Sequence, residues 1–320
     1  MSTEANFITA LRAIATSPAA RGLADDAAVL DIGSSRLVLT MDAIVEGVHF
    51  LGDDPPETVA WKLVATNVSD LTAKGARPRG CLLTYPLTGD DAWDAAFLCG
   101  LDEACSHFAI PLLGGDTVHQ PSGSPRNLSL TALGEPHQDV AVPSRNGAGP
   151  GDRLWVSAAI GDAGLGLALL KGELRTDHVS HDALVAAYRR PQPDPELGLA
   201  LAPYVSAMMD VSDGLMIDTQ RLATASEVAA VIELDQVPLS RAFLMTAGGD
   251  LGARLFAAAA GDDYCLLLAA PASSQSAILA AAAMCKASLY PIGRIMEGQG
   301  LSLLYDGEAI TLPARLGFEH

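Results

Sequence analysis

Aspartates recur in this chain at the ends and turns of the segments that we expect to be strands, and one lies on a helix flank beside an apolar face. The positions are Asp26, Asp42, Asp70, Asp116, Asp210 and Asp213. Carboxylate oxygens are the ligands that Mg²⁺ prefers, and proteins usually hold this ion through a few carboxylates together with the phosphates of a substrate. The pattern therefore predicts a site for magnesium ions and a phosphorylated ligand.

The clearest of these positions follows a buried segment in the second half. The apolar run from Val205 to Met209 is typical of a strand, and it ends in Asp210-Val211-Ser212-Asp213-Gly214, after which a helical pattern begins. Carboxylates beside the free backbone N–H groups of a helix start suit a metal–phosphate site. Ser212 or Asp213 could instead serve only as the N-cap of the helix, because both residue types are common caps.

A hairpin near the N-terminus would bring two more carboxylates together. Val29 and Leu30 are typical of a strand, Gly33-Ser34 of a turn, and Arg36 to Met41 of a returning strand that ends at Asp42. The register of such a hairpin places Asp26 opposite the region of Met41 and Asp42, and like charges this close repel unless a cation lies between them. A loop and a strand end with unrelated carboxylates are the alternative, and the pattern leaves both open.

Asp70 lies on an expected helix. Asp54-Pro55-Pro56-Glu57 is typical of a helix start with Asp54 as the N-cap. The apolar positions that recur along this helix are Trp61, Val64, Val68 and Leu71. A carboxylate beside such a face needs a partner, which is either Lys74, one helical turn further on, or a metal ion.

The strand expected from Ile110 to Leu113 runs into Gly114-Gly115-Asp116. Two glycines allow the backbone to approach a ligand closely, and Asp116 can bind a cation. A plain turn has the same composition, so these residues carry weight only in combination with the other aspartates.

The composition is that of a globular protein with a large core. The chain has 320 residues, of which 49% are hydrophobic and 18% charged, and its net charge is −18. This charge argues against a nucleic-acid partner, because binding the phosphate backbone needs a basic face. It fits a protein that holds phosphates through divalent cations, although a solvated acidic surface explains most of the charges equally well.

Several catalytic signatures are absent from the sequence. It contains no G-x-x-x-x-G-K-[ST] phosphate loop, no protein-kinase motif set, no G-x-S-x-G and no H-E-x-x-H. Its cysteines form an odd set in apolar segments, which predicts buried free thiols in a reducing cytoplasm. The first ten residues lack the features of a signal peptide, and the apolar run 256–260 is too short to span a bilayer. We therefore expect a cytoplasmic protein that does not enter a membrane.

Strands alternate with helices in both halves, which predicts an α/β (α+β) fold. The stretch 135–152 is rich in Pro and Gly and is the best candidate for a linker. We therefore expect two domains, residues 1–138 and 139–320, with the site in the cleft between them. Asp210 and Asp213 should then face Asp26, Asp42 and Asp70 across that cleft.

Together these motifs resemble the thiamine-monophosphate kinases, in the superfamily of aminoimidazole ribonucleotide synthetase. The matching segments are Asp25-Asp26-Ala27-Ala28-Val29, residues 42–50 (DAIVEGVHF), Asn67-Val68-Ser69-Asp70-Leu71, Gly75-Ala76-Arg77-Pro78, Gly114-Gly115-Asp116-Thr117, Pro150-Gly151-Asp152, residues 210–215 (DVSDGL), Gly261-Asp262-Asp263-Tyr264 and Ile292-Gly293. They keep the order of the family and span nearly the whole chain, and E-G-V-H-F points to this kinase rather than to its relatives.

The resemblance implies ATP-dependent, Mg²⁺-assisted phosphorylation of thiamine monophosphate to thiamine diphosphate by direct transfer, with no protein nucleophile. It assigns the metals to Asp26, Thr40, Asp42, Asp70, Asp116, Asp210 and Asp213. It assigns ATP to Gly115, Asp116, Arg145 and Ser212, and the thiamine phosphate to His49, Asp262 and Phe318. It also implies a homodimer formed through the N-terminal domains.

The chain departs from the family pattern at a few positions. Ala24 replaces a usual Gly, Met41 a usual Thr or Ser, Val118-His119 a usual Thr-Arg, and Asp262 a usual Glu. Two other functions stay open. One is a sibling synthetase, although the reactive residue near the N-terminus that selenophosphate synthetases share is missing, since the first cysteine is Cys81. The other is a non-catalytic nucleotide-binding protein that kept the fold.

Overall fold

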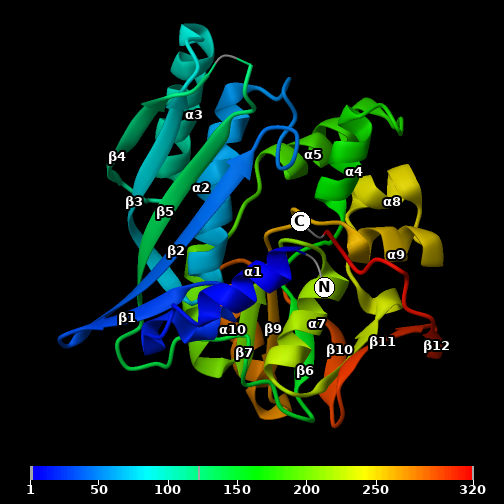
Figure 1. The fold of residues 1–320 in the computed structure, drawn as a ribbon. Helices are drawn as coiled ribbons and strands as arrows, with labels where there is room; N and C mark the ends of the chain where they lie inside the picture. The colour runs from blue at the N-terminus through cyan, green and yellow to red at the C-terminus, as the bar shows by residue number, and fades with distance from the viewer. Residues whose placement is uncertain (1–2, 122, 319–320) are drawn as a thin grey trace.

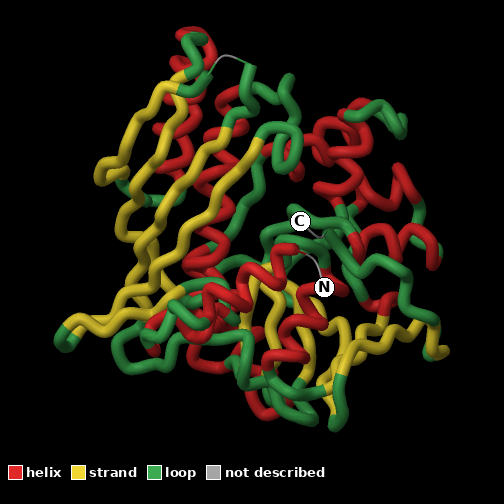
Figure 2. Tube along the Cα trace, viewed as in Figure 1, coloured by secondary structure: helices red, strands yellow, loops and turns green. Residues whose placement is uncertain are grey.

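The computed structural model describes residues 3–121 and 123–318, which are organised around two β-sheets (Figures 1 and 2). The first half forms a five-stranded sheet in the order β1-β2-β5-β3-β4, and the second half a seven-stranded sheet in the order β12-β11-β8-β10-β6-β9-β7. The first sheet contains β1 (Ala28–Ile32), β2 (Ser35–Val45), β3 (Ala76–Leu87), β4 (Leu112–His119) and β5 (Asn127–Pro136). The second contains β6 (Arg153–Val156), β7 (Ala207–Asp210), β8 (Ala229–Glu233), β9 (Leu266–Ala270), β10 (Tyr290–Met296), β11 (Gly300–Tyr305) and β12 (Glu308–Ile310).

Helices connect the strands in both halves, so the expected mixed α/β fold is confirmed. The first half has α1 (Thr3–Arg12), α2 (Pro56–Ala73) and α3 (Asp91–His107), with the 3₁₀ turn η1 (Pro18–Leu23) between α1 and β1. The second has α4 (Asp162–Leu170), α5 (His178–Arg189), α6 (Pro195–Leu201), α7 (Leu215–Ala225), α8 (Arg241–Ala247), α9 (Leu251–Ala259) and α10 (Gln275–Met284), with short 3₁₀ turns at η2 (Ala202–Tyr204), η3 (Leu234–Gln236) and η4 (Ala272–Ser274). A linker was expected at residues 135–152; its first two residues belong to β5, and residues 137–152 contain no helix or strand.

The N-terminal hairpin has the register that the sequence predicts. Ala28 pairs with Leu39 across a turn at Gly33, which brings the segment before β1 close to the middle of β2. The expected end of the second strand at Asp42 is wrong, because β2 continues to Val45 and pairs there with Asn127 of β5. Asp42 therefore lies inside a strand rather than after it.

Helix α2 is the central element of the first half. It covers one face of the first sheet beside α3, and its other side contacts α6 and β7 of the second half (Figure 1). This all-round packing explains why most of its side chains are buried. The expected capping of α2 by Asp54 is wrong, since Pro55 is the N-cap residue. Asp54 instead accepts a hydrogen bond from the backbone N–H of Leu51 and pairs with Arg189.

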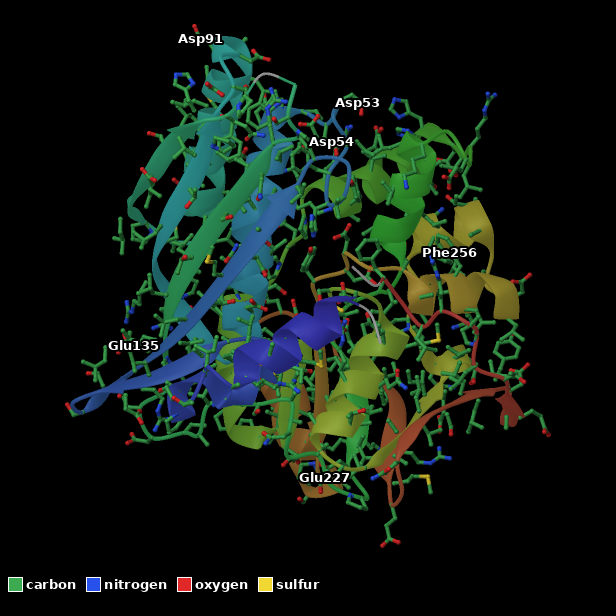
Figure 3. All side chains as sticks on the ribbon, in the orientation of Figure 1. Asp53, Asp54, Asp91, Glu135, Glu227 and Phe256 are labelled. Atoms are coloured by element: carbon green, nitrogen blue, oxygen red, sulfur yellow. The ribbon has the colours of Figure 1, made fainter. Side chains whose placement is uncertain are left out.

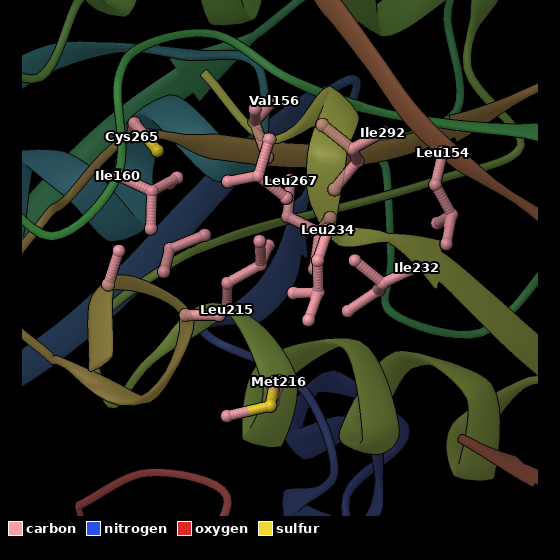
Figure 4. Close-up of a cluster of buried hydrophobic side chains, with 14 of the residues drawn as sticks. Leu154, Val156, Ile160, Leu215, Met216, Ile232, Leu234, Cys265, Leu267 and Ile292 are labelled. Atoms are coloured by element: carbon pink, nitrogen blue, oxygen red, sulfur yellow. The ribbon is translucent and has the colours of Figure 1, made fainter. Parts of the chain in front are cut away.

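The second half has its own apolar core between its sheet and helices. Leu154, Ile232 and Leu267 from three strands pack against Leu215 and Met216 of α7 in the buried cluster shown in Figure 4. Burial of this kind is the main force that holds a strand end in place. It fixes β7 and the start of α7, and with them Asp210 and the residues that follow.

Acidic side chains are spread over the outside of the molecule, as Asp91 and Glu227 at opposite ends show (Figure 3). The expectation of buried thiols holds for Cys81 and Cys265 but is wrong for Cys99, which is exposed; all five cysteines are free. No helix in the described parts of the chain is long and apolar enough to cross a membrane.

Candidate functional site

Three aspartates from distant parts of the chain meet in one cluster. Asp26 precedes β1, Asp70 lies on α2 and Asp210 ends β7, and each offers a carboxylate oxygen within 4.8 Å of the others. The proximity across the two halves that the sequence predicts is therefore confirmed for these three residues. Such an all-oxygen set is the arrangement that a hard divalent cation needs.

Asp42 and Asp213 line the same cleft, which has a volume of about 1280 Å³ and is bounded by both halves. The carboxylate of Asp42 is close enough to Asp26 and Asp213 to be affected by their charge. Thr40, which faces α2 from the same strand, donates its hydroxyl proton to a carboxylate oxygen of Asp70, and its oxygen also lies 3.3 Å from the carbonyl oxygen of Asp26. The cleft thus gathers oxygen ligands from four separate segments.

Burial and mutual repulsion make the ionised form of this cluster costly. Burial, with Asp26 and Asp213 nearby, raises the pKa of Asp42 to about 6. Burial and Asp26 raise the pKa of Asp210 to about 8, against the opposing hydrogen bond from Ser69. Burial raises the pKa of Asp70 well above its usual value, as do the charges of Asp42 and Asp210. A cation between these groups would relieve the repulsion.

The loop after β7 is held by a residue that the sequence did not single out. Oδ2 of the buried Asp218 accepts hydrogen bonds from the backbone N–H groups of Ser212, Asp213 and Gly214, at 3.1, 3.0 and 3.2 Å. The N-cap of α7 is Gly214, so the alternative in which Ser212 or Asp213 serves as the cap is wrong. Their side chains therefore remain available to the cleft, with Asp213 paired to Arg221.

Basic side chains balance part of the negative charge of the carboxylates in the cleft. Arg145, from the segment between the sheets, donates through Nε to Oδ1 of Asp26 at 2.6 Å, and Asp26 raises the pKa of its guanidinium further against the effect of burial. Lys74 contacts Asp25 and Asp26, so the alternative in which it pairs with Asp70 is wrong. Burial raises the pKa of Asp25, but Lys74, Ser144 and Arg21 together outweigh it, and the pKa falls to about 2.

The three residues that the family resemblance assigns to the thiamine phosphate line the same cleft. His49 accepts a hydrogen bond at Nδ1 from the backbone N–H of Val45, at 3.1 Å. The backbone N–H of Phe318 donates to the carbonyl of Asp213, which places the C-terminal segment beside the loop after β7.

Asp262 is held by two residues that the sequence did not suggest. Its carboxylate accepts hydrogen bonds from Lys62 Nζ at 2.9 Å and from the Tyr264 hydroxyl at 3.0 Å. Asp262 and Tyr264 have φ of 69° and 47°, in the left-handed region that non-glycine residues rarely adopt. Backbone hydrogen bonds to Ser212 and Val211 keep this strained segment in place.

Gly115 and Asp116 lie apart from the cleft. Both belong to β4, an exposed edge strand of the first sheet, where Asp116 pairs with Thr84. By the alternation along β3, Thr84 and Asp116 point to the open face, whereas α2 and the aspartate cluster lie on the other. Within one chain Asp116 therefore does not join the other aspartates. Gly115 must be glycine here, because an added Cβ would lie 1.9 Å from the Leu83 carbonyl.

Known proteins share the two-part organisation of this chain. Residues 24–135 match the model "AIR synthase related protein, N-terminal domain", and residues 149–306 match "AIR synthase related protein, C-terminal domain". The chain is 40% identical to the thiamine-monophosphate kinase of Caulobacter vibrioides over 95% of its length and 86% of the relative. It is 33% identical to that of Escherichia coli K12 over 93% and 91%.

A solved structure described as AaThiL complexed with AMPPCP and TMP superposes with a TM-score of 0.83 at 29% identity, covering 97% of this chain and 95% of that one. The sequence relatives, the two matched segments and the superposition agree. This chain belongs to the AIR synthase related protein family and, within it, to the thiamine-monophosphate kinases.

Proposed function

We propose that the cleft between the two sheets is where the γ-phosphoryl group of ATP passes directly to thiamine monophosphate, giving thiamine diphosphate. The observation that carries this proposal is the meeting of Asp26, Asp70 and Asp210 in one cluster within the cleft. The relatives are kinases of thiamine monophosphate, and a similar fold is described in complex with AMPPCP and TMP. A phosphoryl-transfer site needs clustered oxygen ligands and alignment of its substrates.

The residues of the cleft fit Mg²⁺ ions. The aspartates gathered there offer oxygen ligands, and the pKa values of Asp42 and Asp210, raised by burial and by neighbouring carboxylates, support a need for positive charge between them. The proposed ligands are Asp26, Thr40, Asp42, Asp70, Asp116, Asp210 and Asp213. Bound Mg²⁺ would neutralise charge on the phosphate oxygens. The protein's own part is to position: Asp218 fixes the Ser212–Gly214 loop, and no side chain acts as a nucleophile.

We assign ATP to Arg145, Ser212, Gly115 and Asp116. Arg145 contacts Asp26 of the aspartate cluster and is not fully buried, and its fork of donors suits phosphate oxygens. For thiamine monophosphate we assign His49, Asp262 and Phe318. The tie of Asp262 to Lys62 supports a fixed orientation for a carboxylate that is shorter than the Glu usual in the family.

The placement of Asp116 on the open face leads us to propose a homodimer in which a second copy supplies Gly115 and Asp116. Exposed apolar side chains on that face, including Met41, Leu82 and Val118, support a partner there. We also propose that the domains divide as residues 1–138 and 139–320. The separate sheets of the two halves support this division.

Mixing two inactive variants tests whether Asp116 acts across a dimer. Asp42→Asn and Asp116→Asn chains would be unfolded together and refolded at equal amounts. If each site combines Asp42 of one chain with Asp116 of the other, half of the dimers are mixed and each carries one intact site, so about a quarter of the wild-type activity returns. Activity that stays at the level of the separate variants would contradict the proposal.

The kinase activity is tested by supplying ATP, Mg²⁺ and thiamine monophosphate and following thiamine diphosphate by chromatography. Asp213→Asn should lower turnover by orders of magnitude, whereas the matched exposed variant Asp91→Asn should leave it unchanged. A purified protein that binds ATP but forms no product would favour a non-catalytic nucleotide-binding protein.

A further inference from the structure

A lysine ammonium lies inside the acidic site and is sealed from solvent. Lys74 follows the last turn of α2, and its side chain has no exposed surface. Its Nζ lies 2.6 Å from Oδ1 of Asp25, 2.6 Å from Oδ2 of Asp26 and 3.1 Å from the carbonyl oxygen of Met208. Oδ1 of Asp25 and the Met208 carbonyl accept hydrogen bonds from this ammonium group, whereas its contact with Oδ2 of Asp26 is an ion pair without a hydrogen bond. Two hydrogen bonds and two ion pairs therefore hold the ammonium in place.

The two carboxylates do not depend on Lys74 to the same extent. Asp25 also receives hydrogen bonds from Arg21 and from the hydroxyl of Ser144, both on Oδ2. Asp26 has Arg145 on Oδ1 and Lys74 on Oδ2. Asp26 belongs to the aspartate cluster, and Lys74 therefore holds one of the two oxygens with which Asp26 could bind an ion.

We propose that the ammonium of Lys74 is a built-in cation, which permanently fills the position between Asp25 and Asp26 that a divalent ion would otherwise occupy. The proposal rests on the magnesium site proposed above. It adds that one positive charge of the site belongs to the protein itself. Divalent ions then bind Asp26 only from the side that faces Asp70 and Asp210.

The geometry around Nζ supports this substitution of one cation for another. Without the ammonium, two carboxylate oxygens and a carbonyl oxygen would surround a buried space, because Arg21 and Arg145 contact only the other oxygens of Asp25 and Asp26. Buried carboxylate oxygens without a partner are costly, and two of them beside a carbonyl oxygen should attract a cation. Oxygen ligands with two carboxylates favour a divalent ion.

The test counts bound ions in the whole protein. Lys74→Met keeps the length of the side chain and removes its charge. Equilibrium dialysis against Mn²⁺ without nucleotide, with bound ion measured by atomic absorption and free ion by its paramagnetic resonance signal, should give one more Mn²⁺ per chain than in the wild type. Asp25→Asn combined with Lys74→Met should lose this additional ion, because one of the two carboxylates is gone.

Equal numbers of Mn²⁺ in Lys74→Met and the wild type would overturn the proposal. If Lys74→Met unfolds without metal, its recovery of a folded state in Mn²⁺ supports the proposal, and failure to fold at saturating Mn²⁺ overturns it. The difference in bound Mn²⁺ between Lys74→Met and the wild type tests only the proposal about Lys74. A wild type that binds no Mn²⁺ would instead remove the magnesium site of the proposed function.

Discussion

Replacing Asp210 with Asn should make the metal-free protein more stable, even though it removes a proposed metal ligand. In the folded protein, burial and the charge of Asp26 raise the pKa of Asp210 from 3.8 to about 8. In the unfolded chain the pKa returns to its ordinary value. Between these values the folded state binds a proton that the unfolded state has released, so stability falls as the pH rises from roughly 4 to 8.

The size of this effect follows from the pKa difference. One pKa unit corresponds to about 1.4 kcal/mol. At pH 7 the ionisation of Asp210 in the unfolded chain lowers the free energy of unfolding by about 4 kcal/mol, and at pH 5 by about 2 kcal/mol. Asn cannot ionise, and its amide oxygen can still accept the hydrogen bond that Ser69 donates at 2.7 Å. The variant should therefore gain most of these amounts.

Urea unfolding in the presence of a chelator measures the prediction at pH 5 and pH 7. Asp210→Asn should exceed the wild type by about 4 kcal/mol at pH 7 and by about half of that at pH 5. Asp91→Asn, on the exposed end of α3, should show neither gain. Added Mg²⁺ should then stabilise the wild type more than Asp210→Asn, because binding to the folded state shifts its equilibrium.

A less stable Asp210→Asn, or a gain that is the same at both pH values, would refute the reasoning. Either result would mean that the cluster is already neutralised in the metal-free protein. The nearby guanidinium of Arg145 would then be the first group to examine, since it lowers the pKa of Asp210.

Three further changes test how the site is positioned. Asp218→Ala removes the acceptor of three backbone N–H groups and should cost at least about 3 kcal/mol in urea unfolding, and a loss below about 1 kcal/mol would contradict this role. Gly115→Ala should lower the free energy of unfolding by about 1–3 kcal/mol, and with it the melting temperature, because its Cβ would clash with the Leu83 carbonyl. An unchanged melting temperature would show that β4 shifts easily to make room. Lys62→Met removes the ion pair that orients Asp262 and leaves only the Tyr264 hydroxyl on its carboxylate, so it should raise KM for thiamine monophosphate about tenfold without changing KM for ATP. Equal rises in both KM values would indicate a general structural defect.

Local patterns predicted the parts of the site that depend on neighbouring residues. The hairpin register follows from a short turn and from alternating strands, and it correctly placed Asp26 near the middle of β2. The apolar run before Asp210 correctly predicted a buried strand that ends at this residue. In both cases the residues that decide the geometry are close together in the chain.

Long-range contacts decided where the predictions failed. Lys74 lies one turn after Asp70, yet it follows the end of α2 and its side chain turns to Asp25 and Asp26, far away in the sequence. Asp116 is the residue type of a metal ligand, but the pairing of β4 with β3 places it on the open face of the sheet. The residues next to Asp116 in the sequence do not specify that pairing. Sequence spacing alone cannot supply these tertiary relations.

The burial of α2 between both sheets has a consequence for how such chains can be recombined. Its side chains fit the first sheet on one side and α6 and β7 on the other, and Arg77 just after it pairs with Glu196. The interface between the two matched segments is therefore formed by residues of both. A chimaera that takes residues 24–135 from this chain and the remainder from a relative would inherit α2 without its matching surface. A chimaera of two relatives should fold stably only when α2, α6 and β7 all come from the same parent.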